Sequence, residues 1–311
     1  MARLRPLLAA ALLLGALASP AQQVADAAFQ PPIPRPAYAP GQGPAVAIDE
    51  GHHNFHTAEG RYQPFAALLR RDGYAVAGLR GPLTAEALRA VGVLVIANPL
   101  HARNEEDWSL PTPSAYTPEE VAAVKAWVAA GGALFLIVDH MPFPGGAGEL
   151  AQAFGVTFSN GFAQDGRWQP GRQDAFDAAT GLKEGPATKG RAGDPPITRV
   201  ATFTGSAFQV PKEALPVLVF GPGAFSLTPA KAWTFTPETP KPSIEGWCQG
   251  ALLPFGKGRV AVFGEAAMFT AQLAGPERRK VGMNGPEAGQ NAQLLLNVLH
   301  WLSRAPGMPE R

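Results

Sequence analysis

Residues 117–140 read "TPEEVAAVKAWVAAGGALFLIVDH", and this stretch decides the fold class. A threonine that can cap a helix is followed by a proline suited to the first helical position and by two glutamates that favour the positive end of the helix dipole. The glycine pair 131–132 ends this helix. The apolar run 133–139 has no polar alternation, which is typical of a strand buried on both faces. The stretch therefore predicts a helix over 117–132 and a buried strand directly after it.

The same alternation recurs elsewhere along the chain. Apolar strands are predicted at 45–49, 74–79, 91–97 and 258–265. Helices are predicted at 61–73, 84–90, 146–155 and 288–304. Strands that lack polar alternation and are separated by helices indicate a parallel sheet covered on both faces. The predicted fold class is therefore α/β, with three layers in which a mostly parallel sheet is flanked by helices.

The chain of 311 residues divides into several predicted parts. Residues 1–21 combine two arginines, a short apolar run and a small-residue stretch, which is the pattern of a secretory signal peptide. Residues 22–43 form a Pro-rich linker, and 44–305 form one α/β domain. Within this domain, 159–258 is rich in turn-forming residues and is predicted to be a β-rich insertion. We expect a secreted or periplasmic protein without a membrane span once the signal peptide is cleaved.

Charge and cysteine content exclude several classes of protein. The formal net charge is +1, so there is no electrostatic case for binding nucleic acid. Cys248 is the single cysteine, which excludes a disulfide framework and a cysteine-rich zinc site. Because it lies in the predicted insertion and not directly after a sheet strand, we expect an inert thiol rather than a nucleophile.

Polar side chains directly follow four of the predicted strands. They are Asp49, Glu50, His52, His53, Asn54 and His56 after the first strand, Asn98 and His101 after 91–97, Asp139 and His140 after 133–139, and Glu265 near the end of 258–265. In a doubly wound sheet the carboxyl ends of the strands lie along one edge, where ligands bind. Any one of these residues could cap a helix, hold a turn or lie exposed. Their recurrence at four strand ends favours a common site.

Two chemistries suit these residue types. Imidazole and carboxylate groups can hold a divalent metal such as zinc. The candidate metal ligands are His52, His56 and His101. Without a metal, a histidine oriented by a carboxylate can act as a general base near neutral pH. The candidate catalytic residues are His53, Asp139, His140 and Glu265.

A further set of polar and aromatic side chains could bind a ligand at the same edge. The candidates are Asp49, Glu50, Asn54, Asn98, His101 and Trp108. Trp108 lies on the loop 102–116, which could serve as a lid or as a platform on which a sugar stacks, or could be a solvated acidic loop. No HExxH, GxSxG, GxGxxG or phosphate-binding loop is present, so the motifs do not name a reaction.

The order of the segments resembles a known family. The stretches that carry the resemblance are "VAIDEGHHNFHTAEGRYQPFAALLRRDGY", "VGVLVIANPLH", "YTPEEVAAVKAWVAAGGALFLIVDH" and "GRVAVFGEAAMFTAQ". They are similar to DUF4350-type proteins, which belong to the class I glutamine amidotransferase-like group with a flavodoxin-type α/β fold. The resemblance covers most of 44–158 and 256–304. It implies a fold, and the sugar-processing proteins in related groups imply a carbohydrate ligand by analogy.

The resemblance does not extend to glutaminase chemistry. True amidotransferases of this group carry a nucleophilic cysteine after the strand written here "LFLIVD", where this chain has Asp139, His140 and Met141. Two functions from different classes therefore stay open. One is a secreted hydrolase-like enzyme acting on a carbohydrate or cell-envelope substrate. The other is a non-catalytic periplasmic module that binds a sugar or another small molecule in the same crevice.

The signal pattern generates the first prediction. Cleavage after the small-residue stretch should give a mature protein that begins near Gln22 or Ser19. N-terminal sequencing of protein recovered outside the cytoplasm tests this. An exported chain that still begins with Met1 or Ala2 would contradict it.

Overall fold

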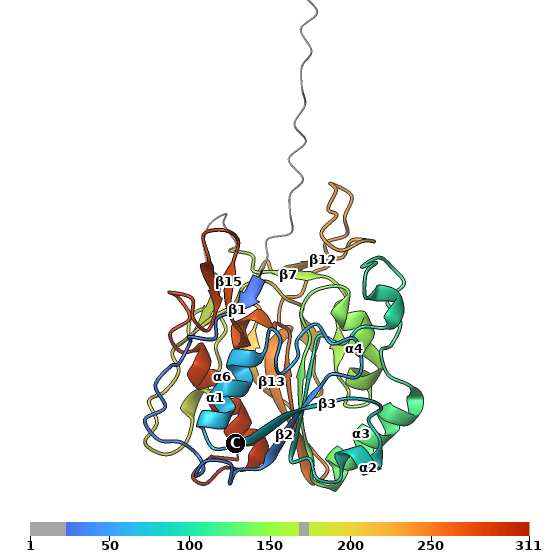
Figure 1. The fold of residues 1–311 in the computed structure, drawn as a ribbon. Helices are drawn as coiled ribbons and strands as arrows, with labels where there is room; N and C mark the ends of the chain where they lie inside the picture. Colours follow the sequence, from blue (N-terminus) through green and yellow to red (C-terminus); the bar gives the residue numbers. More distant parts are fainter. Residues whose placement is uncertain (1–22, 168–173, 311) are drawn as a thin grey trace, which may run out of the picture.

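The computed structural model describes residues 23–167 and 174–310, and the predicted signal peptide over 1–21 lies outside the described residues. Its main element is a nine-stranded sheet with the order β3-β2-β4-β5-β14-β13-β10-β6, in which β11 also pairs with β13 (Figure 1). The strands of this sheet are β2 Ala45–Asp49, β3 Ala75–Leu79, β4 Val93–Ala97, β5 Ala133–Ile137, β6 Thr157–Phe158, β10 Phe208–Gln209, β11 Leu215–Val219, β13 Cys248–Phe255 and β14 Gly258–Phe263.

The sheet is mixed, and the prediction of a mostly parallel sheet is not confirmed. Strands β3, β2, β4, β5 and β14 pair in parallel. The remaining pairings, of β13 with β14, β11 and β10 and of β10 with β6, are antiparallel. The cause is a tight turn between Phe255 and Gly258, which reverses the chain and lays β13 against β14. The segment 159–258 therefore extends the main sheet with its own strands.

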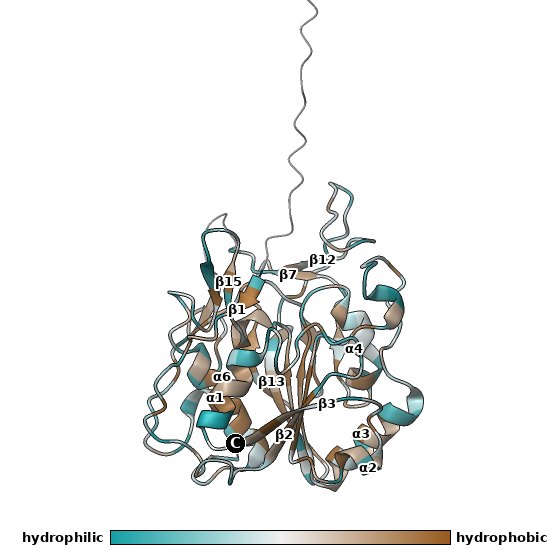
Figure 2. Ribbon diagram, viewed as in Figure 1, coloured by the Kyte–Doolittle hydropathy of each residue, from teal (hydrophilic) through white to brown (hydrophobic). Residues whose placement is uncertain are grey.

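Helices cover both faces of this sheet, as Figure 1 shows. They are α1 Gln63–Arg71, α2 Ala85–Leu88, α3 Pro118–Ala130, α4 Phe143–Gln152, α5 Pro186–Lys189 and α6 Asn291–Ser303, with short 3-10 turns η1 Ala102–Asn104 and η2 Ala267–Phe269. Strand β5 shows how the core is divided. Its Phe135 packs in one cluster with residues of α1 and α6, whereas Leu134 and Leu136 pack in another with residues of α3 and α4. Figure 2 shows the resulting apolar centre between more polar outer surfaces.

The helix α3 begins as its sequence predicts. The N–H of Glu120 donates to the Thr117 hydroxyl over 3.3 Å, and the N–H of Thr117 donates to the Glu120 carboxylate over 3.0 Å. This reciprocal capping box satisfies two backbone donors that the helix itself cannot pair. It also fixes the Glu120 carboxylate in a buried position, where it meets a histidine from another loop.

Smaller sheets lie beyond one end of the main sheet (Figure 1). The first has three strands in the order β1 Gln23–Ala25, β15 Ala271–Ala274 and β16 Arg279–Gly282. The other two have two strands each: β7 Phe162–Gln164 with β12 Phe225–Leu227, and β8 Ala175–Asp177 with β9 Arg199–Ala201. The segment expected to be a linker therefore contains a strand, and its Phe29, Ile33 and Tyr38 pack against the core. Among the described residues, no helix combines the length and apolar character needed to cross a bilayer.

A substitution at Phe135 tests how much this core cluster contributes to the stability of the fold. It is fully buried on β5, so Phe135→Ala should lower the free energy of unfolding by about 3–5 kcal/mol through lost contacts and a residual cavity. Phe235→Ala is the matched control, because that ring is 42% exposed and should matter far less. Urea unfolding followed by circular dichroism measures both. Equal losses in the two variants would contradict this account of the core.

Candidate functional site

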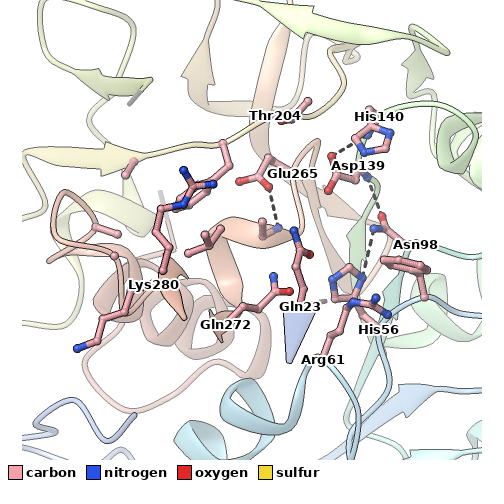
Figure 3. A pocket seen from close by; sticks show the side chains of 18 of the residues that line it. Gln23, His56, Arg61, Asn98, Asp139, His140, Thr204, Glu265, Gln272 and Lys280 are labelled. Atoms are coloured by element: carbon pink, nitrogen blue, oxygen red, sulfur yellow. Dashed lines mark hydrogen bonds between the residues drawn. The ribbon is translucent and has the colours of Figure 1, made fainter. Parts of the chain in front are cut away.

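A cavity of about 1100 Å³ opens where the parallel strands end. Four strand-end side chains from the predicted set line it: His56 beyond β2, Asn98 beyond β4, Asp139 beyond β5 and Glu265 beyond β14. His140 and Trp108, also singled out from the sequence, line the same cavity. Figure 3 shows His56, Asn98, Asp139 and His140 on one side, Gln272 and Lys280 of the small β1-β15-β16 sheet on the other, and Glu265 between them. The structure thus brings together six of the predicted residues.

Asn98 ties three of the strand ends to one another. Its side-chain oxygen accepts the N–H of Asp139 over 2.8 Å, and its side-chain nitrogen donates to Nδ1 of His56 over 3.2 Å. Its backbone has a positive φ of 51°, a conformation that asparagine tolerates better than most residues. Because Nδ1 of His56 accepts a hydrogen bond, the proton of the neutral ring is on Nε2.

His56 is held as a neutral ring. Its side chain is buried and packs on Tyr62, with the ring centroids 4.7 Å apart. Burial, and then the nearby charge of Arg61, lowers the pKa of His56 to about 3. The ring can therefore donate a hydrogen bond to a ligand but does not supply a positive charge at neutral pH.

Asp139 and Glu265 form an unequal pair of carboxyl groups. Glu265 is fully buried, and its two oxygens accept the N–H groups of Ala267 and Met268 over 2.7 and 2.8 Å. Burial, and then the negative charge of Asp139, raises the pKa of Glu265 well above its usual range in spite of these donors. The pKa of the buried Tyr62 hydroxyl is raised as well, by burial and then by Glu265 and Asp139. Glu265 thus keeps its proton to a higher pH than an ordinary glutamate does.

His140 presents one free ring nitrogen. Its Nδ1 donates to the carbonyl of Met141 over 2.6 Å, so Nε2 is left for another partner. The ring stacks on Phe162 at a centroid distance of 4.5 Å, and the edge of Trp233 packs against it at 4.6 Å. These contacts fix the ring plane, and the backbone N–H of His140 donates to the Asp139 carboxylate over 2.8 Å.

Aromatic side chains form one wall of the cavity, and sequence reasoning found only part of it. Trp108 packs against Phe55 and Phe143 at 5.6 and 5.3 Å, as expected for a platform beside the crevice. Trp233 was missed, because it lies in the irregular segment between β12 and β13 and does not follow a strand of the main sheet. The loop that carries Trp108 and the loop that carries Trp233 are joined by a hydrogen bond from the N–H of Ala232 to the carbonyl of Trp108. No signal in the sequence links them.

Basic side chains, called here the basic wall, also line the cavity, and they too were missed. Arg61, Arg199, Arg279 and Lys280 line the cavity together with Gln23 and Gln272. Most of them lie on or beside the small sheets, whose pairing joins distant parts of the chain. Arg61 could have been found from its place just after the "HHNFH" loop, but nothing in the sequence marks it as facing inward.

A second cluster in the same loop lies outside the cavity. Nδ1 of His52 is 2.9 Å from the Asp49 carboxylate, and Nε2 is 2.9 Å from the Glu120 carboxylate. Asn54 and Tyr116 also donate to Asp49, over 3.2 and 2.9 Å. Burial opposes the charged ring, but the hydrogen bonds and charges of the two carboxylates outweigh it, and the pKa of His52 is raised. These residues form a buried ionic network that anchors the loop to α3.

Three other predicted residues do not reach the cavity. The half-exposed His53 ring pairs with Glu105, with Nδ1 2.9 Å from a carboxylate oxygen. Nδ1 of the exposed His101 accepts the N–H of Arg103 and so caps a 3-10 turn. Glu50 accepts the N–H of Ala58 and pairs with Arg80.

The predicted metal ligands His52, His56 and His101 are not brought to a common point. Both ring nitrogens of His52 are taken up by carboxylates, Nδ1 of His56 is bound to Asn98, and His101 caps an exposed turn. Within residues 23–167 and 174–310, no group of three or more His, Cys, Asp or Glu side chains is arranged to hold a metal ion. The zinc interpretation therefore finds no support in this geometry.

Cys248 lies on β13, within the main sheet. Its side chain is buried in the core cluster beside α3 and α4, and it does not line the cavity. Burial raises the pKa of the thiol to about 11. Cys248 thus belongs to a strand of the main sheet and not to an irregular segment, and its low reactivity stays a prediction that burial favours.

Comparisons with known proteins give the fold a context. No family model matches the sequence, and no curated protein matches it. The solved structure of the mmIFT52 N-terminal domain aligns with a TM-score of 0.59 at 15% identity, covering 83% of this chain and 97% of that domain. A putative ThuA-like protein from Bacteroides uniformis aligns with a TM-score of 0.47 at 12% identity, over 85% of this chain and 93% of the other. At 15% identity the first similarity shows a shared fold alone.

The His52 network generates a prediction about stability and pH. His52→Ala leaves two buried carboxylates facing each other, so it should cost about 3–5 kcal/mol of unfolding free energy near pH 6. Because the folded-state pKa of His52 is raised above 6.5, its contribution is fully present below that pH and is lost as the pH rises through the folded value. The gap between wild type and variant should therefore shrink from pH 6 to pH 9.

Urea unfolding at several pH values measures this gap. The matched control is His53→Ala, which removes the adjacent ring from an exposed ion pair and should change stability little. A gap that stays constant with pH, or an equal loss in the control, would show that His52 does not act as a buried cation.

Proposed function

We propose that this protein is a hydrolase-like enzyme that acts on a carbohydrate in the strand-end cavity. The observation that carries the proposal is that two carboxyl groups, Asp139 and Glu265, line one cavity, and that burial and then the nearby Asp139 raise the pKa of Glu265 well above its usual range. Two neighbouring carboxyl groups whose environments separate their pKa values can supply an acid and a base at the same pH. The hydrolysis of glycosidic bonds uses such a pair.

The proposed roles follow from these environments. Glu265 gives its proton to the oxygen of the departing group, and Asp139 accepts a proton from the attacking water. Since the two groups are neighbours, the proton can then return from Asp139 to Glu265 and restore the starting state. Nε2 of His140 and Nε2–H of His56 are available to hold substrate hydroxyl groups, since their Nδ1 atoms are already hydrogen-bonded.

The aromatic wall supports a carbohydrate as substrate. Trp108, Trp233, Phe55 and Phe143 offer flat apolar faces beside a small number of oriented polar groups. A sugar ring presents an apolar face and a rim of hydroxyl groups, so it can use both kinds of contact at once.

A non-catalytic sugar-binding module is the second candidate. It is favoured by one observation: both oxygens of Glu265 already accept backbone N–H groups, as expected of a residue that only caps the turn η2. In that case the aromatic wall, Asp139 and the two histidines bind a sugar without cleaving it.

We also propose a family and a location for this protein. The stretches similar to DUF4350-type, class I glutamine amidotransferase-like proteins correspond to β2 with α1, to β4, to α3 with β5, and to β14 with its following turn. We propose that these elements belong to the three-layer fold of that group. The basic and apolar start of the sequence supports secretion or a periplasmic location.

Asp139→Asn tests the enzymatic role. The substitution keeps the shape of the side chain but removes the base, so kcat on a cleavable 4-nitrophenyl glycoside should fall by about 100-fold or more. Binding of the matching methyl glycoside, followed by tryptophan fluorescence, should stay within a few-fold. Glu213→Gln, which removes an exposed carboxylate outside the cavity, is the control.

The outcomes separate the two candidates. Turnover that is lost in Asp139→Asn and kept in Glu213→Gln supports the enzyme. If the wild type binds saccharides but turns over none of the 4-nitrophenyl glycosides tested, the binding module is favoured. Unchanged turnover in a folded Asp139→Asn variant would exclude the proposed acid–base pair.

A further inference from the structure

The basic wall has more positive charge than its surroundings neutralise. Arg199 pairs with Glu287 over 3.3 Å. Arg61, Arg279 and Lys280 line the same cavity, and no acidic side chain among the described residues lies within ion-pair distance of any of them. The other carboxyl groups that line the cavity are Asp139 and Glu265, and the pKa of Glu265 is raised by burial and then by Asp139. The field inside the cavity therefore favours an anion.

Arg61 is the cation set deepest in this wall. Its guanidinium carbon lies 3.8 Å from the centroid of the Phe55 ring, which fixes the plane of the group. Its Nε is buried and has no hydrogen-bond partner. Burial lowers the pKa of Arg61, and the charge is felt by the neighbouring His56. A half-buried cation without a counter-charge is unfavourable, so this position is suited to an anionic group from outside the protein.

Gln272 provides a second, independent observation. Its side chain is 2% exposed and lines the cavity, and its Oε1 has no hydrogen-bond partner. The amide orientation is fixed, because Nε2 donates to the Thr270 hydroxyl over 2.7 Å while that hydroxyl donates to the carbonyl of Ala267 over 2.8 Å. A buried acceptor without a donor indicates a missing partner, such as a ligand hydroxyl.

We propose that the cavity takes an acidic carbohydrate that carries a carboxylate, such as a uronate, with the carboxylate on Arg61 and a hydroxyl on Oε1 of Gln272. Figure 3 shows both side chains bordering the same cavity. This inference rests on the proposed function and narrows its substrate class. A single deeply set cation matches the single charge of a carboxylate, and the planar guanidinium fits its two oxygens. The exposed Arg279 and Lys280 attract the anion from the mouth of the cavity.

The test compares each acidic sugar with its own neutral form. Trisaccharides of galacturonate, glucuronate and mannuronate, and the methyl ester of each, are titrated into the full-length protein by calorimetry. The wild type should bind at least one free acid about tenfold or more tightly than its ester, because an ester cannot accept a charge-assisted pair from Arg61. Added NaCl should weaken binding of the acid and leave binding of the ester nearly unchanged.

Variants show which side chain causes the preference for the free acid over the ester. Arg61→Gln should abolish the preference for the acid without weakening the ester, and Arg61→Lys should retain part of it because the charge remains without the planar fork. Arg279→Gln combined with Lys280→Gln should reduce the preference to a smaller extent. Arg89→Gln, at an exposed ion pair outside the cavity, is the matched control and should bind like the wild type.

The results distinguish this inference from the proposed function. Equal binding of acids and esters by the wild type overturns the acidic specificity but leaves a carbohydrate site standing. A preference that persists in folded Arg61→Gln also overturns it. Failure of the wild type to bind any acid, ester or neutral glycoside overturns both. The comparison of acid with ester in the wild type needs no variant, so it tests the preference for an acidic sugar even if Arg61→Gln does not fold.

Discussion

Burial of both faces of the parallel strands is the constraint on which the rest of the structure depends. Strands β4 and β5 have no exposed side chain between Val93 and Ala97 or between Ala133 and Ile137. Such strands cannot carry charged or amide groups along their length without a large desolvation cost. Polar chemistry is therefore displaced to the strand ends, and parallel pairing brings those ends to one edge. Asn98 then joins the ends of β4 and β5 to the His56 loop by hydrogen bonds.

The two buried histidines of one short loop show how surroundings decide the role of a side chain. His52 lies between two carboxylates and is stabilised as a cation, whereas His56 lies near Arg61 in an apolar setting and stays neutral. The first anchors the loop to α3, and the second faces the cavity. The same residue type thus has two roles, because burial acts on both rings and only His52 has carboxylate partners that offset it, whereas Arg61 adds to it at His56.

Much of the framework could be predicted from the sequence because its signals are local. The capping box at Thr117 and the continuous apolar runs of β2, β4, β5 and β14 are each written in a few adjacent residues. Strand direction could not be predicted for β13, since an apolar segment reads alike in a parallel or antiparallel pairing. Which loop histidine faces inward could not be predicted either, because it depends on backbone torsions such as the positive φ of His53. Most of the basic wall could not be predicted, since Arg199, Arg279 and Lys280 lie on small sheets that pair segments distant in the sequence.

The pairing of β1 with β15 has a consequence for the order in which the site can form. Strand β1 comes from the beginning of the described chain and β15 from its last quarter, yet Gln23 and Gln272 line the same cavity. A contact between such distant segments must wait until nearly the whole chain has been synthesised, and closing so long a loop slows folding. Helix α6 also follows β15 in the chain and packs on the core, so the core and this wall of the cavity are completed by the same late segment. A chain that ends before β15 would lose both. A chain shortened at its beginning, in contrast, can lose β1 and the Gln23 contribution to the wall while keeping the strands and helices of the core.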